Sequence, residues 1–219
     1  MENIRDNFQR PDPDLVAALG EIATANLGDA MNRQGVMHSR IKGVFKGIRM
    51  AGPAYTVKNQ IRENLMSHYA LKHAEPGDVL VIDNGGYLEA AGWGELMTLA
   101  ARIKGLAGVV VDGGVRDSAV LEAMRFPVFS ARITPKGTIK HMPGAINGPV
   151  VCGDLPVHPG DILVGDDDGV AVVPLGRAEA VLEQARAIQI KEKGLRERIN
   201  KGESLFDIFG LGELLPPAG

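Results

Sequence analysis

The sequence is poor in cysteine. Cys152 is the only cysteine among 219 residues, so no disulfide can form within the chain and no set of cysteines can bind zinc. A lone cysteine usually behaves as a small apolar side chain, and we expect Cys152 to be buried. Disulfide-rich domains and cysteine-ligated zinc domains are therefore excluded.

The sequence also lacks an excess of one charge, a large share of aromatic residues, and long apolar runs. It has 24 basic and 27 acidic residues, a net charge of −3, and 5% aromatic residues, so nothing predicts a nucleic-acid partner. The opening stretch "MENIRDNFQRPDPD" has no apolar segment typical of a signal peptide, and no later run reaches membrane length. We therefore expect a cytoplasmic protein without a membrane partner.

Hydrophobic residues and glycines are plentiful. Hydrophobic residues make up 45% of the chain, which is enough apolar material for a sizeable core. The 28 glycines indicate many tight turns. No stretch has the composition of a linker. We predict that residues 1–219 form a single α/β domain.

The first part of the chain alternates between helical and extended patterns. Apolar residues recur at helical intervals over 13–36, with Thr24 or Asn26 as the point where this stretch divides into two helices. Residues 41–59 alternate as strands with a break at Gly-Pro, and residues 64–74 predict a helix.

The centre of the chain has the clearest pattern. Short apolar runs at 78–83, 109–112 and 127–133 predict buried strands, and the segments 95–108 and 117–124 between them predict helices. Glycine-rich loops are expected at 84–94 and 113–117. Strands and helices that alternate at this spacing form right-handed crossovers, which predicts a parallel βαβαβ core.

The carboxyl-terminal half has a different texture. Residues 136–176 are rich in Gly and Pro, with short apolar runs typical of hairpins, and "GDDDG" at 165–169 predicts a hairpin turn better than a metal-binding loop. A long helix with an interruption at Gly194 should follow. We expect this helix and the apolar tail, residues 177–219, to lie at a subunit interface.

Candidate site residues cluster where two of the predicted strands end. Ligands of parallel α/β sheets bind outside the carboxyl ends of the strands. The helix that starts near Glu95 offers free backbone N–H groups to an anion. Gly92 and Gly94 have no side chains and would let the anion come close to the backbone. Arg116 is suited to a carboxylate or an enolate, and Asp117 and Glu95 are hard oxygen donors suited to Mg²⁺ or Mn²⁺.

Each of these residues also has an ordinary structural explanation. Asp117 would cap the helix 117–124, and Arg116 would form a surface ion pair. Glu95 would be an acid in the first turn of a helix, where the helix dipole stabilises a negative charge. The loops match no nucleotide-binding motif. The histidines show no metal-ligand spacing and are expected on the surface or with hydrogen-bond partners.

The stretch "GELMTLAARIKGLAGVVVDGGVRD" resembles the signature of a known family. That family contains the 4-hydroxy-4-methyl-2-oxoglutarate / 4-carboxy-4-hydroxy-2-oxoadipate aldolases and the regulators of ribonuclease E activity. Its signature is an acid, twenty intervening residues and Arg-Asp, which correspond to Glu95, residues 96–115, and Arg116-Asp117. The blocks "PGDVLVIDNGG" and "PGDILVGDDDGVAVVP" fit the flanking parts of the family pattern.

The resemblance implies a fold and an activity. The fold would be a swivelling β/β/α-type domain assembled as a homotrimer or hexamer. The activity would be that of a class II pyruvate aldolase, which uses Mg²⁺ or Mn²⁺ to cleave a 4-hydroxy-2-oxo diacid. Oxaloacetate decarboxylation could share the site, because it passes through the same pyruvate enolate.

The resemblance also implies roles for single residues. Asp117 would bind the metal, and Glu95, where the aldolases often have Asp, would hold a metal-bound water. Arg116 would face the keto oxygen or the hydroxyl at the bond that breaks. The helix start at Gly94, with the amides of Leu96 and Met97, would hold the pyruvate carboxylate. From a neighbouring subunit, Glu192 would reach the metal shell.

A rival interpretation is a non-catalytic protein inhibitor similar to the regulators of ribonuclease E activity. In that branch the acid and the Arg-Asp pair need not all be present, whereas Glu95, Arg116 and Asp117 are all present in this chain. The complete set favours an enzyme acting on a small-molecule 2-oxo acid. A methyltransferase is disfavoured because no glycine-rich nucleoside loop is present.

Overall fold

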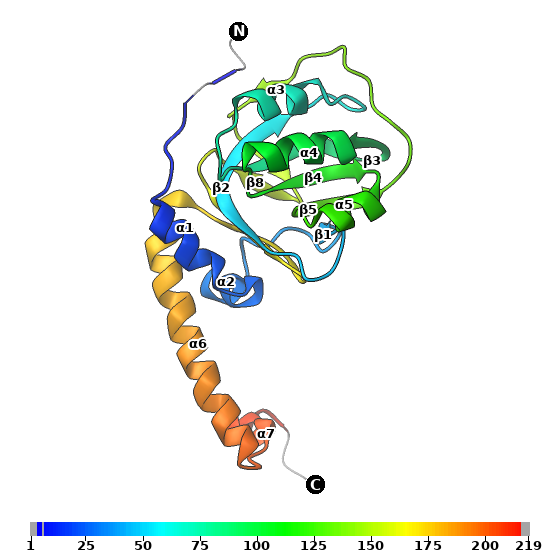
Figure 1. Ribbon diagram of the computed structural model, residues 1–219. Helices are drawn as coiled ribbons and strands as arrows, with labels where there is room; N and C mark the ends of the chain where they lie inside the picture. The colour runs from blue at the N-terminus through cyan, green and yellow to red at the C-terminus, as the bar shows by residue number, and fades with distance from the viewer. Residues whose placement is uncertain (1–3, 6, 216–219) are drawn as a thin grey trace.

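The parallel sheet is the centre of the fold. The structure, a computed structural model, describes residues 4–5 and 7–215 (Figure 1). Four strands run parallel in the spatial order β5-β4-β3-β2. Their bounds are β2 Met50–Lys58, β3 Val79–Trp93, β4 Gly108–Val115 and β5 Val128–Ile133. The predicted parallel core is confirmed, and β2 extends it by one strand.

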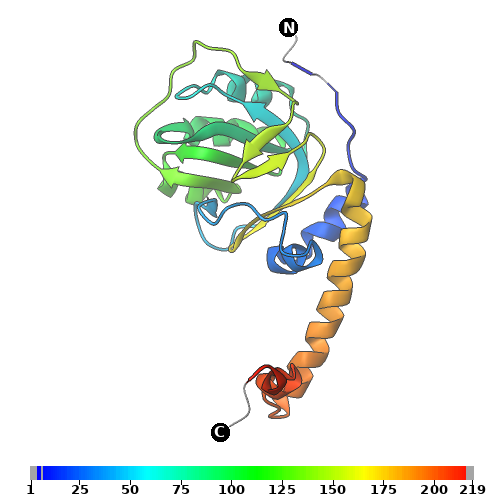
Figure 2. The same cartoon turned by 180° about the vertical axis from the view of Figure 1, so that it is seen from behind.

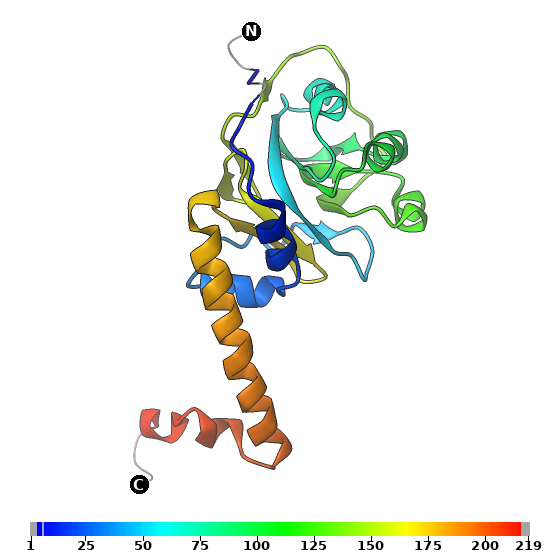
Figure 3. The same cartoon turned by 60° about the vertical axis from the view of Figure 1, so that its left-hand side comes forward.

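The crossover helices lie together on one face of this sheet (Figures 1 and 3). Their bounds are α3 Leu65–His73, α4 Glu95–Lys104 and α5 Ser118–Met124. α4 ends at Gly105, which adopts the left-handed conformation common at a helix carboxyl end, with φ 79°. Because the connections are right-handed and short, all of these helices start at the same edge of the sheet.

The antiparallel strands extend the parallel sheet and cover its other face, as Figure 2 shows from behind. β2 bridges the two halves, because its first residues pair with β9 and its last residues pair with β3 and β6. The remaining strands are β1 Lys42–Gly43, β6 Ala145–Ile146, β7 Val150–Cys152, β8 Leu155–Val157, β9 Ile162–Asp166 and β10 Gly169–Val173. The predicted hairpins are confirmed, and "GDDDG" is the turn between β9 and β10.

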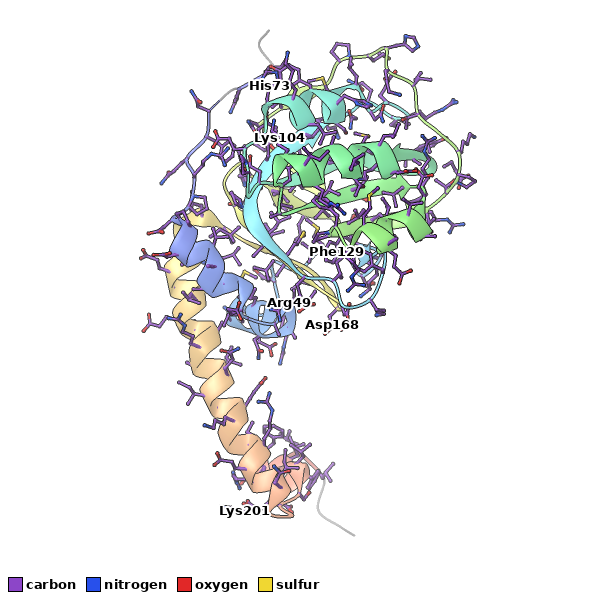
Figure 4. The ribbon with its side chains drawn as sticks, viewed as in Figure 1. Arg49, His73, Lys104, Phe129, Asp168 and Lys201 are labelled. Carbon is purple, nitrogen blue, oxygen red and sulfur yellow. The ribbon has the colours of Figure 1, made fainter. Side chains whose placement is uncertain are left out.

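Helices from the two ends of the chain pack on the antiparallel half. α2 begins at Thr24, which confirms the division of the 13–36 stretch. The bounds are α1 Pro13–Gly20, α2 Thr24–Ala30, the 3-10 turns η1 Leu175–Arg177 and η2 Leu211–Leu214, α6 Ala178–Asn200 and α7 Leu205–Ile208. α6 projects away from the sheet, with Lys201 at its far end (Figure 4). Gly194 does not interrupt α6, because one glycine costs a helix only about 1 kcal/mol.

Apolar clusters fill the spaces between these layers. The first lies between the parallel sheet and α3, α4 and α5, and includes Trp93 and Leu121. The second lies between the sheet and the antiparallel strands, and includes Phe129 and the buried Cys152. The third joins β9 and β10 to α1, α2 and α6. The result is a mixed α/β domain of the β/β/α type.

The repeated "PGD" segments form the same turn before two strands. Asp78 accepts the Glu75 amide at 2.8 Å, and Asp161 accepts the His158 amide at 2.8 Å. The preceding glycines have φ of 88° and 87°, a conformation that favours glycine. The two "PGD" segments are therefore alike in sequence because each forms the same local turn that leads into a strand.

Three further sequence predictions about local structure are wrong. Residues 84–93 continue β3 as an irregular strand with bulges, and Gly113 and Gly114 lie within β4. β2 runs unbroken through Gly52 and Pro53, which pair with β9. These segments have turn-like composition, but the neighbouring strands supply hydrogen-bond partners that override local preference.

In the part of the chain that the structure describes, no helix is long and apolar enough to span a membrane.

Candidate active site at the carboxyl edge of the parallel sheet

A pocket of about 440 Å³ lies where β3 and β4 end and α4 begins. It is lined from one side by Gly94, Glu95, Leu96, Met97, Arg116 and Asp117. These are the predicted site residues with the exception of Glu192. Residues separated by a whole helix and strand thus meet at one place, as the topology of the parallel sheet requires.

The start of α4 has donors that no protein group uses. Gly94 at the N-cap position supplies no side chain, and within residues 4–5 and 7–215 the amides of Leu96 and Met97 have no acceptor. The Glu95 amide donates to Asp117 Oδ2 at 3.0 Å. Free amides at a helix start favour a small anion, so the predicted anion-binding geometry is present.

The glycines beside this helix start lie against side chains of the protein. A Cβ on Gly94 would lie 2.6 Å from Asp117 Oδ2, and a Cβ on Gly92 would lie 2.3 Å from Asn84 Nδ2. Side chains of the protein therefore occupy the space that the missing Cβ atoms leave. Gly94 lets the Asp117 carboxylate lie directly over the helix start.

Asp117 adopts a left-handed backbone conformation, with φ 61°, at the N-cap position of α5. Its side chain makes no capping bond to α5 and instead caps α4 through the Glu95 amide. The prediction that Asp117 caps its own helix is wrong in this respect, because the positive φ directs the side chain toward α4. Asp tolerates this conformation better than most residues.

Arg116 is fixed by its backbone and free at its guanidinium. Its amide donates to Trp93 O at 3.1 Å, which joins the ends of β3 and β4. Among the residues that the structure describes, the guanidinium makes one loose contact, from Nε to Asp117 Oδ2 at 3.5 Å, and the side chain is 49% exposed. Most of its donors thus remain free for a carboxylate or a developing oxyanion.

Glu95 is exposed, and within the described ranges its carboxylate has no hydrogen-bonding or ionic partner. Beside Asp117 it gives the pocket two acidic side chains. In the part of the chain described by the structure, no group of three or more His, Cys, Asp or Glu residues is arranged to hold a metal ion. The pocket therefore offers hard oxygen donors without a complete protein cage.

Glu192 is the one predicted site residue that the fold does not bring to this pocket. It lies on α6, where its carboxylate accepts Asn26 Nδ2 at 2.9 Å and pairs with Arg196 at 2.8 Å. α6 packs against α1 and α2 on the antiparallel half of the domain, apart from α4 (Figure 3). Within one chain Glu192 is a surface acid with local partners.

The other wall of the pocket contains residues that sequence reasoning missed. Asn64, His68 and Lys140 come from α3 and from the long connection between β5 and β6. Partial burial, with the Lys140 ammonium as a second cause, lowers the pKa of His68. No motif marks these residues, because α3 and the connection meet only in the folded chain.

Trp93 and Tyr87 both lie in the irregular second half of β3 and could either shape the pocket or pack in the core. Trp93 does both, since it lines the pocket and its indole Nε1 donates to Thr98 Oγ1 at 2.8 Å beneath α4. Tyr87 pairs with β4 as part of the irregular end of β3 and does not line the pocket.

A larger cavity of about 720 Å³ lies between α1 and the start of β2, beside Arg49 (Figure 4). Prolines and aliphatic side chains dominate its lining. Its arginines are already engaged, since Arg10 pairs with Asp78 and Arg49 donates to Gly20 O at 2.7 Å. It contains none of the predicted site residues, so size alone does not identify the chemical site.

The fold and the pocket define a class of protein. It is a β/β/α domain in which a helix start with free amides, an arginine and two carboxylates meet at the edge of a parallel sheet, a combination suited to a small carboxylate ligand. Residues 24–172 match the family model described as "RraA-like: Aldolase/RraA". The chain belongs to the Aldolase/RraA family.

Relatives and solved structures agree with this assignment. A protein of Halalkalibacterium halodurans, named "Putative 4-hydroxy-4-methyl-2-oxoglutarate aldolase", is 38% identical over 185 residues, which cover 84% of this chain and 88% of the relative. An uncharacterized Pseudomonas syringae protein of known structure is 28% identical with a TM-score of 0.83, covering 92% of this chain and 95% of its own.

A third similar protein points to the other branch of the family. Streptomyces coelicolor RraAS2, described as an unusual member of the RNase ES inhibitor RraA protein family, is 29% identical with a TM-score of 0.78. The match covers 86% of this chain and 100% of the RraAS2 chain. The family thus contains proteins named as aldolases and proteins named as inhibitors.

Proposed function

We propose that this protein is a divalent-metal-dependent aldolase that cleaves a 4-hydroxy-2-oxo diacid and releases pyruvate by way of its enolate. The observation that carries the proposal is the meeting of free helix-start amides, Arg116 and two carboxylates in one pocket. The names of the aldolase relatives support the same reaction class. Oxaloacetate decarboxylation would be a second reaction, because losing CO₂ yields the same enolate.

The donor set fits Mg²⁺ or Mn²⁺. Mg²⁺ is commonly held by one or two carboxylates, with waters and substrate oxygens completing its shell, so a full protein cage is not required. Asp117 Oδ2 is used by the Glu95 amide, which leaves Oδ1 for a cation, and the Glu95 side chain lines the same pocket. When bound, the cation would supply a Lewis acid for the carboxylate and keto oxygens of a 2-oxo acid.

The pocket residues would bind the substrate, move a proton and stabilise negative charge. The amides of Leu96 and Met97 bind the substrate carboxylate and fix its orientation. Glu95 holds the water that takes the proton of the 4-hydroxyl. The C3–C4 bond then breaks, C4 becomes the carbonyl carbon of the second product, and the electron pair moves into the pyruvate enolate. Arg116 offsets the negative charge that develops on oxygen during this step.

We further propose that the working form is a homotrimer or a dimer of trimers. One support is the apolar face of α4, where Leu96 is 76% and Ile103 78% exposed, although helices normally turn such a face inward. A second is the tail beyond α6, in which Phe206 and Phe209 are also exposed. Such an assembly would let Glu192 approach the Asp117 of a neighbouring subunit.

The decisive experiment measures pyruvate release from 4-hydroxy-4-methyl-2-oxoglutarate and from oxaloacetate. We expect turnover with Mg²⁺ or Mn²⁺, loss of turnover in excess chelator, and recovery on adding metal back. Full turnover in excess chelator, with no metal found in the protein, would contradict the metal dependence. A monomer with full activity would contradict the assembly.

The alternative is a non-catalytic inhibitor of ribonuclease E, favoured by the similarity to RraAS2. It predicts no pyruvate from any 2-oxo acid, together with slower RNA cleavage when the protein is added to ribonuclease E. The two assays on one preparation separate the alternatives.

A further inference from the structure

Glu63 is a buried acid that the proposed reaction does not use. It lies just before α3, is 2% exposed, and does not line the pocket. Its Oε2 accepts the His141 amide at 2.9 Å, whereas its Oε1 is buried and, in the part of the chain that the structure describes, has no hydrogen-bond partner. Burying a carboxylate is costly unless its oxygens are hydrogen-bonded, so the position of Glu63 needs an explanation beyond packing.

The His141 amide belongs to a strap, which we define as residues 135–143 of the connection between β5 and β6. This connection arches past the carboxyl edge of the parallel sheet (Figure 1). Thr138 of the strap lines the pocket, and a Cβ on Gly137 would lie 3.3 Å from Nη1 of Arg116. The strap is therefore one wall of the pocket, and its position decides how far the pocket is open.

Hydrogen bonds hold the strap in place, because none of its residues is buried. The Ile139 amide donates to Arg62 O at 3.0 Å, and the Ile139 carbonyl accepts the Asn64 amide at 3.2 Å. A hydrogen bond to a carboxylate is stronger than one to a carbonyl, so the bond from His141 to Glu63 holds the strap more firmly than these do. A segment held in this way can open without exposing buried apolar side chains.

We propose that Glu63 is a positioning residue that holds the strap closed against the pocket, and that a 2-oxo acid enters and leaves when the strap lifts. Oε2 of Glu63 favours the closed position through the His141 amide. Oε1 favours the open position, because lifting the strap lets water reach an oxygen that has no partner when the strap is closed. The two oxygens thus keep the closed and open positions close in free energy, as a movable wall requires.

This inference rests on the proposed function for the identity of the ligand and adds a moving part to the site. A closed strap confines the substrate and the transition state alike. Loss of the bond between His141 and Glu63 should therefore raise KM and leave kcat nearly unchanged. A purely structural role for Glu63 predicts instead a lower melting temperature with an unchanged KM.

The bond can be removed from the exposed side of the strap, where a matched control exists. His141→Pro deletes the amide donor, whereas His141→Ala deletes the same side chain and keeps the amide. His141 is exposed and does not line the pocket, so neither variant alters the core or the pocket lining. Hydrogen exchange of the Ile139 amide reports the opening of the strap without relying on turnover. We expect this amide to exchange roughly 10- to 100-fold faster in His141→Pro, the range for losing a hydrogen bond to a charged group, and within about threefold of wild type in His141→Ala.

Variants of Glu63 test the same bond from the buried side. Glu63→Gln keeps an acceptor for the His141 amide, and Glu63→Leu does not. We expect Glu63→Leu to match His141→Pro, with KM for pyruvate release raised roughly 10-fold or more and kcat within about twofold of wild type. Glu63→Gln should restore most of the lost KM. If Glu63→Leu does not fold, the two His141 variants decide the question by themselves.

The outcomes separate this inference from the proposed function. Equal exchange of the Ile139 amide in His141→Pro and His141→Ala overturns the inference, even if the wild type releases pyruvate. Faster exchange in His141→Pro with an unchanged KM overturns the positioning role. If the wild type releases no pyruvate, the aldolase is refuted and binding decides about the strap. Mg²⁺ and pyruvate should then slow exchange of the Ile139 amide in the wild type, and an unchanged rate overturns the inference.

Discussion

Asp112 within β4 and Asp117 just beyond it each face an arginine, Arg40 and Arg116, and the two ion pairs differ in almost every physical respect. Asp112 is 3% exposed, and it receives Arg40 Nη2 at 2.9 Å and the Gly153 amide at 2.9 Å. Arg40 is further held by Asp154, and these bonds raise the pKa of its guanidinium. This pair attaches the β7–β8 hairpin to the parallel sheet.

The Arg116–Asp117 pair, a few residues later, is loose and half-exposed, with 3.5 Å between Nε and Oδ2. An ion pair whose donors and acceptors are all in use cannot bind a ligand, whereas a pair with unused donors and acceptors can. Residue type alone therefore does not separate a structural ion pair from a candidate catalytic one. The two are separated by the number of hydrogen-bonding positions that remain free.

The largest expected effect follows from removing the loose arginine. Arg116→Ala should lower turnover roughly 10²-fold or more, the scale for losing one transition-state charge stabiliser. Stability should change by less than about 1 kcal/mol, as for an exposed ion pair. Steady-state kinetics and thermal melting of the same preparation measure both. An unchanged turnover number on every 2-oxo acid tested would make this pair an ordinary surface feature.

The saturated pair should behave in the opposite way. Asp112→Asn removes the charge that Arg40 faces while keeping an acceptor for the Gly153 amide. It should lower the free energy of unfolding by about 2 kcal/mol, the scale for a hydrogen bond to a charged group. Urea denaturation measures the loss, with Asp154→Asn at the exposed end of the same pair as a milder control. A lower turnover number in Asp112→Asn protein that is still fully folded would show that Asp112 also takes part in the reaction.

A smaller effect is expected from the carboxylate of the loose pair. Asp117→Asn keeps an oxygen that can accept the Glu95 amide, so the start of α4 should remain capped. Without the charge, Mg²⁺ affinity should fall by roughly 10-fold or more. Titration calorimetry reads the affinity, and circular dichroism reads the helix. If Mg²⁺ binds equally well to this variant, Asp117 is a capping residue alone.

The smallest effect concerns Lys140, which lines the pocket together with His68. Burial first, and Lys140 second, lower the pKa of His68, so removing the ammonium in Lys140→Met should move that pKa back toward its ordinary value. The direction follows because a nearby positive charge disfavours the imidazolium. An NMR titration of the imidazole signals reads the change. An identical pKa in both proteins would place Lys140 too far from His68 to act with it.

The sequence alone determined the layout of the parallel core and the core of the site. Runs such as "VVVD" can be buried only as strands, and helices such as 95–104 must cross between them in one direction. Glu95, Arg116 and Asp117 therefore had to meet at one edge of the sheet. Local periodicity and the handedness of crossovers are short-range properties, and a sequence contains them in full.

Only the tertiary structure decided the rest. β2 became a parallel strand and residues 84–93 became sheet because neighbouring strands supplied their hydrogen bonds. Asp117 caps α4 and not α5, and His68 and Lys140 face the same pocket, because chain segments far apart in sequence pack together. Such contacts depend on the register and packing of the whole domain, which no local pattern specifies.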